Sequence, residues 1–83
     1  MLDIEIANIY RLNDNSSIKA FCDIIVSDMV LIKGIRIIEG RNGLFVRMPA
    51  KAGKDGKWYE SITPMSKEIR DALNEIIIKA FNT

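Results

Sequence analysis

Residues 18–48 constrain the fold more than any other stretch, because isoleucine and valine dominate them. These β-branched side chains are stiff at χ1 and favour extended strands. Two turn signals divide the stretch into predicted strands at residues 18–26, 30–39 and 44–48, with the turns at Ser27-Asp28 and Asn42-Gly43 and the end at Pro49. Because the apolar run is nearly continuous, a single bent strand across the first turn is the alternative interpretation.

The two ends of the chain show different periodicities. Residues 2–6 alternate between apolar and polar side chains and the pattern loosens through residues 8–10, which predicts a first strand that ends at the polar cluster 13–17. Near the C-terminus the apolar residues recur at spacings of three and four, at Ile69, Ala72, Leu73, Ile76, Ile77, Ala80 and Phe81. This spacing predicts a helix with one apolar stripe, capped by Thr63 with Pro64 as its first residue.

Between these regions, residues 51–57 predict a flexible loop around Asp55-Gly56, followed by a short strand at 58–60. The patterns together predict an α+β fold, in which an antiparallel β-sheet of four to five strands carries a C-terminal helix packed on one face. With 83 residues, the chain is expected to form one domain over residues 1–83. One helix covers one face only, so the apolar residues of the other face, Ile25, Ile38 and Phe45, predict a symmetric homodimer.

Catalytic and metal-binding patterns are weak. The chain has no histidine, which removes the usual general base, and its one cysteine, Cys22, lies in an apolar strand phase that predicts an inert buried thiol. Asp3 and Glu5 share a strand face but supply too few ligands for a metal site. We therefore expect no enzymatic activity, cofactor, metal or small-molecule substrate. The lone cysteine and the charged residues that interrupt the longest apolar region, residues 18–38, favour a cytoplasmic protein without a membrane segment.

The predicted hairpin around Asn42-Gly43 has two different faces. A two-residue turn there would bring Ile37 opposite Met48 and make Arg36 a diagonal neighbour of Arg47. The side that the helix covers would then contain Ile35, Ile37, Leu44, Val46 and Met48, and the other side Arg36, Ile38, Phe45 and Arg47. Two guanidinium groups beside an aromatic ring are suited to binding phosphates and stacking a base.

Positive charge is concentrated in the following residues. Residues 41–59 contain five basic residues and one acid, a local charge of +4 in a chain of net charge +1. The candidate nucleic-acid-binding residues are therefore Arg36, Arg41, Phe45, Arg47, Lys51, Lys54 and Lys57. Phosphate contacts are expected mainly from Arg41, Arg47, Lys51, Lys54 and Lys57. The alternative is that these charges only solvate the surface, that Phe45 is buried in a dimer, and that Trp58 belongs to the core.

The segment GIRIIEGRNGLFVRMPAK at residues 34–51, followed by DGKWYESITP at residues 55–64, resembles the SpoVG family of bacterial sporulation and septation regulators. The residues that fit the family pattern are Arg36, Asn42, Gly43, Phe45, Pro49, Lys51, Asp55, Gly56, Pro64 and Arg70. The chain departs from it at Ala52 and Thr63, and its first strand keeps only Arg11 where relatives carry several arginines.

The resemblance implies a small dimeric regulator that binds DNA or RNA and has no catalytic activity. We therefore expect a homodimer that binds nucleic acid through the hairpin and the loop and acts in sporulation, septation or gene regulation. The alternative is a protein–protein interaction module that acts on division or transcription machinery through apolar sheet edges. The two differ in their response to salt, because only phosphate contacts weaken steeply with ionic strength.

Overall fold

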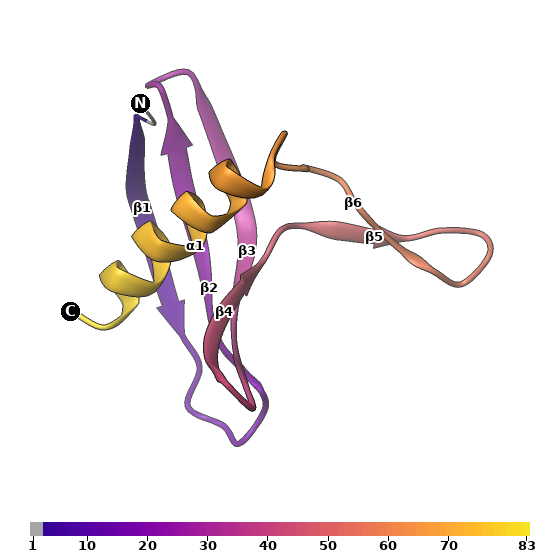
Figure 1. Ribbon diagram of the computed structural model, residues 1–83. Helices are drawn as coiled ribbons and strands as arrows, with labels where there is room; N and C mark the ends of the chain where they lie inside the picture. Colours follow the sequence, from indigo (N-terminus) through magenta and orange to yellow (C-terminus); the bar gives the residue numbers. More distant parts are fainter. Residues whose placement is uncertain (1–2) are drawn as a thin grey trace.

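The computed structural model describes residues 3–83 and contains two antiparallel sheets and one helix (Figure 1). The large sheet has the strand order β1-β2-β3-β4, and the small sheet pairs β5 with β6. The elements are β1 (Ile4–Arg11), β2 (Ile18–Val26), β3 (Val30–Gly40), β4 (Gly43–Arg47), β5 (Ala50–Ala52), β6 (Trp58–Glu60) and α1 (Lys67–Phe81). The α+β fold that the sequence predicts is confirmed. The predicted start of the first strand, at residue 2, lies outside the described residues.

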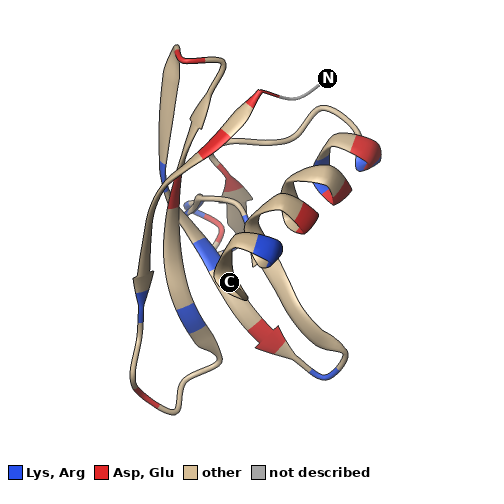
Figure 2. Cartoon of the chain, turned by 90° about the vertical axis from the view of Figure 1, so that its left-hand side faces the viewer, with Lys and Arg blue, Asp and Glu red and all other residues tan. Residues whose placement is uncertain are grey.

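Helix α1 packs across one face of the large sheet and leaves the opposite face uncovered (Figure 2). The buried core lies between the helix and the sheet face that it covers, and it consists of Ala20, Cys22, Ile24, Ile35, Ile37, Met48, Leu73 and Ile77. Burial raises the pKa of the Cys22 thiol to about 11, so this cysteine is the inert core residue that its strand phase predicts. The helix is also tied to β4, because the backbone N–H of Val46 donates to Asn74 Oδ1 at 2.9 Å.

The helix begins later than the sequence predicts. Its N-cap is Ser66, whose hydroxyl accepts a hydrogen bond from the backbone N–H of Ile69 at 3.2 Å. The prediction of Thr63 as N-cap, with Pro64 at the first helical position, is therefore wrong. A serine hydroxyl three residues before Ile69 satisfies one of the unpaired donors at the helix start, and Pro64 lies in the irregular segment between β6 and α1.

The β3–β4 hairpin turns one residue earlier than predicted. Gly40 pairs with Gly43, so Arg41 and Asn42 form the turn, and Arg36 is the direct partner of Arg47 rather than its diagonal neighbour. The ring of Phe45 packs over Gly40, since a Cβ atom on this glycine would lie only 2.8 Å from the ring. Residues 36–40 of β3 each pair with a β4 residue two positions earlier than predicted, for example Ile37 with Val46 instead of Met48. Because two is an even number, every side chain keeps its predicted face.

A β-bulge in β3 determines which side Arg36 faces. Lys33 and Gly34 stand opposite the single residue Asp23, and Gly34 has a φ of 82°. The bulge allows both Ile32 and Ile35, three residues apart, to pack on the helix side. Without the extra residue, the period of two would turn Arg36 toward the helix. The bulge therefore puts Arg36 on the uncovered face.

The bulge is held by a buried carboxylate. Asp23 is only 7% exposed, and its Oδ1 accepts a hydrogen bond from the backbone N–H of Gly34 at 3.1 Å. Its Oδ2 accepts from the side-chain amide of Asn8 at 3.2 Å, next to a second register shift in β1. Asp23 therefore satisfies a donor that the interrupted ladder leaves without a strand partner.

The predicted flexible loop at residues 51–57 is instead largely a second hairpin. We call residues 50–60 the arm, because β5 and β6 project away from the large sheet and the helix (Figure 1). The backbone N–H of Gly53 donates to the carbonyl of Lys57 at 2.7 Å, and Gly56 has a φ of 82°, which closes a tight turn. In the described part of the chain, no helix is long and apolar enough to cross a membrane.

Candidate nucleic-acid interface

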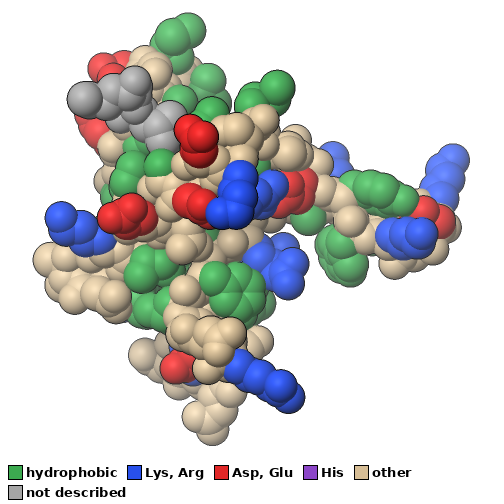
Figure 3. Space-filling model, in the orientation of Figure 1, with side chains coloured by type: hydrophobic (Ala, Val, Ile, Leu, Met, Phe, Trp, Pro, Cys, Tyr) green, Lys and Arg blue, Asp and Glu red, His purple; other side chains and the backbone are tan. Residues whose placement is uncertain are grey.

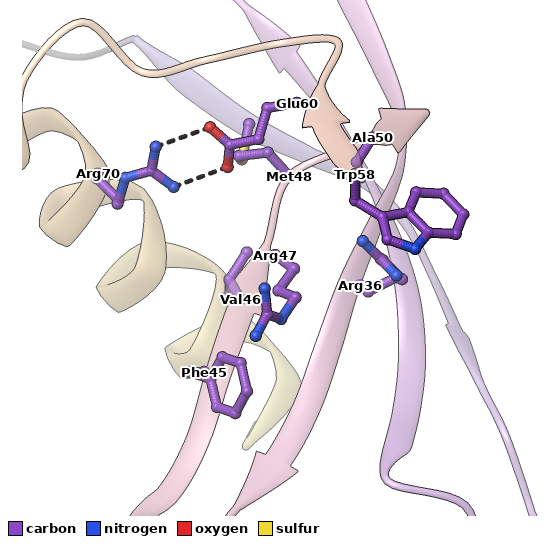
Figure 4. A pocket seen from close by; sticks show the side chains of 9 residues that line it. All are labelled: Arg36, Phe45, Val46, Arg47, Met48, Ala50, Trp58, Glu60 and Arg70. Carbon is purple, nitrogen blue, oxygen red and sulfur yellow. Dashed lines mark hydrogen bonds and ion pairs between the residues drawn. The ribbon is translucent and has the colours of Figure 1, made fainter. Parts of the chain in front are cut away.

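An open groove lies where the base of the arm meets the outer edge of the large sheet (Figure 4). We call it the cationic groove, and it has a volume of about 460 Å³. Its lining residues come from β3, β4, the segment that joins β4 to the arm, the arm itself and the helix, and they are Arg36, Phe45, Val46, Arg47, Met48, Ala50, Trp58, Glu60 and Arg70. Three of the four site residues predicted from the β3–β4 hairpin, Arg36, Phe45 and Arg47, thus lie together in it, and Arg41 does not line it.

Two arginines stand opposite each other across the β3–β4 ladder. Arg36 and Arg47 are direct cross-strand partners, and neither forms a salt bridge among residues 3–83. Like charges in this position destabilise a sheet, so the pair lowers stability unless an anion binds between the guanidinium groups. The Arg47 guanidinium also lies over the Phe45 ring, 5.5 Å from its centroid. This contact orients Arg47 along the groove.

Arg70, the third arginine of the groove, is neutralised by Glu60. Both terminal nitrogens of Arg70 donate to the carboxylate of Glu60, each at 2.9 Å, in a two-pronged ion pair (Figure 4). Hydrogen bonds from Arg70 hold the pKa of Glu60 below its usual value. Three arginines and one glutamate leave the groove with a net charge of +2, and Arg36 and Arg47 supply the free positive charge.

The arm has one face toward the groove and one face away from it. The pairs Ala50–Glu60 and Ala52–Trp58 share the groove side, because cross-strand partners point the same way. Trp58 is 70% exposed, so the alternative that it belongs to the core is wrong. An exposed indole beside two free guanidinium groups is a combination suited to binding a flat ring attached to an anion.

The far side of the arm is stiffened by a short polar network. The Tyr59 hydroxyl donates to the Asp55 carboxylate, which also accepts from the backbone N–H of Lys57 at 3.0 Å. This hydrogen bond raises the pKa of Tyr59 and lowers that of Asp55. A Cβ atom on Gly53 would come within 2.6 Å of the Tyr59 ring, so only glycine fits there. The turn of the arm is therefore ordered by its own side chains.

The other predicted site residues are distributed around the groove rather than in it. Lys51 pairs with Tyr59 on the far face of the arm, and Arg41 lies in the β3–β4 turn. Lys54 and Lys57 belong to the turn that closes the arm, where basic side chains gather at its free end (Figure 3). Arg11, the one arginine of the first strand, donates to the carbonyl of Phe81 at 2.8 Å and so holds the C-terminal end of α1.

Sequence reasoning did not assign Trp58, Glu60 or Arg70 to the site. The available signal was the alternation of residues 50, 52, 58 and 60 about the Asp55-Gly56 turn, which predicts a hairpin with Trp58 and Glu60 on one face. The position of Arg70 had no comparable signal, because it depends on how the helix packs against the sheet.

Comparison with known proteins identifies similar chains. The family model described as SpoVG matches residues 1–83. A protein of Archaeoglobus fulgidus named as the septation protein SpoVG is 33% identical over 81 residues, which cover 98% of this chain and 95% of that protein. A protein of the same name from Macrococcus caseolyticus is 33% identical over 87% of this chain and 63% of its own length. In Listeria monocytogenes, a protein named as septation protein SpoVG 2 is 30% identical over 86% of this chain and 70% of its own length.

Proposed function

The chain belongs to the SpoVG family, and we propose that it is a non-enzymatic regulator that binds DNA or RNA in the cationic groove. The observation that carries the proposal is the opposed pair Arg36 and Arg47, which has no carboxylate partner among residues 3–83. Its relatives are named for septation, so a role in septation or in the regulation of related genes is the process we assign to it.

The phosphate backbone is the natural ligand of such a pair. Arginine presents a planar fork of donors that matches phosphate oxygens, and two forks on adjacent strands can hold two neighbouring phosphates of one backbone. From the groove the backbone would follow the arm to Lys54 and Lys57, which gives four contacts in all. Lys51 and Arg41 lie outside this path and contribute only to the general field of the molecule.

The test is binding of a fluorescently labelled oligonucleotide, measured by anisotropy between 50 and 200 mM salt. Four phosphate contacts give a log–log slope of about −2.8 for a single strand and about −3.6 for a duplex, so single-strand affinity should fall about 50-fold over this range. Replacing Arg47 by Ala should flatten the single-strand slope by about 0.7. The control is Lys79→Ala, because Lys79 is an exposed cation in the last turn of α1.

Two results would contradict this function. One is the absence of binding to both single-stranded and double-stranded oligonucleotides at 50 mM salt. The other is an Arg47→Ala variant with the same affinity and the same salt slope as the wild type. That result would mean that the charges of the groove are only solvated and do not bind phosphate.

A second candidate is a protein-interaction module, and one observation favours it. In the β2–β3 turn, Met29 is 83% exposed and is followed by the exposed Val30 and Leu31, far along the strands from the cationic groove. Exposed apolar side chains in succession are typical of protein contact sites. This function predicts partner binding that is nearly independent of salt and that is lost on changing Met29 and Leu31 to polar residues.

A further inference from the structure

We propose that the cationic groove takes single-stranded nucleic acid, with an unpaired base stacked on the Trp58 indole and the adjoining phosphates held by Arg36 and Arg47. This inference rests on the proposed function and adds the class of ligand and the residue that distinguishes it. It starts from the juxtaposition of an open indole and two free cations in one groove (Figure 4).

The indole is available because its neighbours on the arm are small. Trp58 is paired with Ala52, and Ala50 is the next residue of β5 on the same face. A methyl group cannot cover a ring of this size, and Trp58 remains 70% exposed. Cation–π contacts in the described chain involve Phe45 and Phe81 only. The indole therefore presents a π-face to the groove that no arginine occupies.

Phe45 is the less suitable platform, although the sequence pointed to it. Its ring packs over Gly40 on one strand and carries the Arg47 guanidinium above it at 5.5 Å. It is half-buried, whereas Trp58 is exposed. Phe45 thus orients Arg47, and Trp58 is the residue on which we expect the base to stack.

The position of the indole selects against a duplex. Bases in a double helix are stacked on one another and present only their edges, so a side chain can stack on a base only after that base leaves the helix. Bases of a single strand expose their faces, and aromatic stacking of this kind tolerates any sequence. The phosphates of a duplex can still reach Arg36 and Arg47. We therefore expect a duplex to bind, but more weakly than a single strand.

The experiment uses the intrinsic fluorescence of Trp58, which is the only tryptophan of the chain. A thymidine 12-mer should quench it on binding at 50 mM salt, and a blunt duplex of equal charge should not. Trp58→Ala should lose roughly 5- to 150-fold in affinity for the single strand, with an unchanged salt slope and unchanged duplex affinity. Trp58→Phe should keep most of the affinity. Because Trp58 is exposed, both variants should give the circular dichroism spectrum of the wild type.

Tyr10→Ala is the matched control, since Tyr10 is an exposed aromatic residue on β1, at the opposite edge of the large sheet. If it weakens single-strand binding as much as Trp58→Ala does, the sheet face is the platform and the inference is wrong. The inference is also wrong if single strands bind without quenching and Trp58→Ala binds as tightly as the wild type, although the proposed function then stands. If neither oligonucleotide binds, both are wrong.

Discussion

Asp23 should be among the most sensitive positions in the protein, because one buried carboxylate holds the bulge that directs Arg36 to the groove. Its Oδ1 accepts from the N–H of Gly34, which is partly buried, and its Oδ2 accepts from Asn8, which is exposed. In Asp23→Ala, water can replace the partner of Asn8. The Gly34 N–H has no such replacement, because the ladder is interrupted at the bulge.

The expected cost follows from these two bonds. A buried donor that loses its partner costs about 1–3 kcal/mol, and a bond to a charged acceptor lies in the upper part of that range. We therefore expect Asp23→Ala to lower the free energy of unfolding by about 2–3 kcal/mol. For a chain of this size, with a urea m-value of about 1 kcal/mol per molar, the unfolding midpoint should fall by roughly 2–3 M.

Asp23→Asn separates hydrogen bonding from charge. Its carbonyl can still accept from Gly34, and the Asn8 amide can rotate to accept from the new NH₂ group, so the loss should stay below about 1 kcal/mol. Urea denaturation followed by circular dichroism measures all three proteins. Asp3→Ala is the control, because Asp3 is exposed and its side chain makes no hydrogen bond in the described chain. An unchanged midpoint in Asp23→Ala would refute the assignment of the bulge to this carboxylate.

The remaining predictions concern the helix start, the groove charge and assembly. Ser66→Ala should cost about 1 kcal/mol in urea denaturation while Thr63→Ala costs almost nothing, because Ser66 is the N-cap; equal losses would contradict this cap. Glu60→Gln should strengthen single-strand binding and steepen the salt slope by about 0.7, because it frees Arg70. The pKa of Glu60 is lowered in the folded protein, so the ion pair stabilises the fold above the ordinary value of 4.5. That contribution is lost as the pH falls through the lower folded value, and the difference in binding between Glu60→Gln and wild type should close over the same range. Light scattering at tens of micromolar protein should give the mass of a homodimer, since the uncovered sheet face carries Ile25, Ile38 and Phe45; a monomer mass would exclude it.

Local periodicity was enough to predict much of this fold. The division of the β3–β4 hairpin into a core face and an open face follows from a period of two, and it survives a change in turn position because the partners move by an even number of residues. The apolar stripe of α1 is likewise confirmed, with Leu73 and Ile77 buried. These features depend on neighbours within one element, whose spacing is written in the chain.

Turn and cap positions were less predictable, because several residues compete for each of them. Asn42-Gly43 has the composition of a type I′ turn, yet positive φ at both central residues occurs at Ser27 and Asp28 instead. Thr63 and Ser66 are both acceptable caps, and the packing of α1 on the sheet selects Ser66. Differences of about 1 kcal/mol between such alternatives are smaller than the free energy of tertiary packing.

The sequence by itself determined the four strands of the large sheet, β6, the helix apart from its start, the two faces of the hairpin and the concentration of basic residues between 41 and 59. Only the tertiary structure decided which of those residues act together. Arg36, Trp58 and Arg70 are separated along the chain by more than ten residues each, and they meet because the bulge, the arm and the helix fold toward one groove. Long-range placement depends on packing between elements, and no local pattern of residues encodes it.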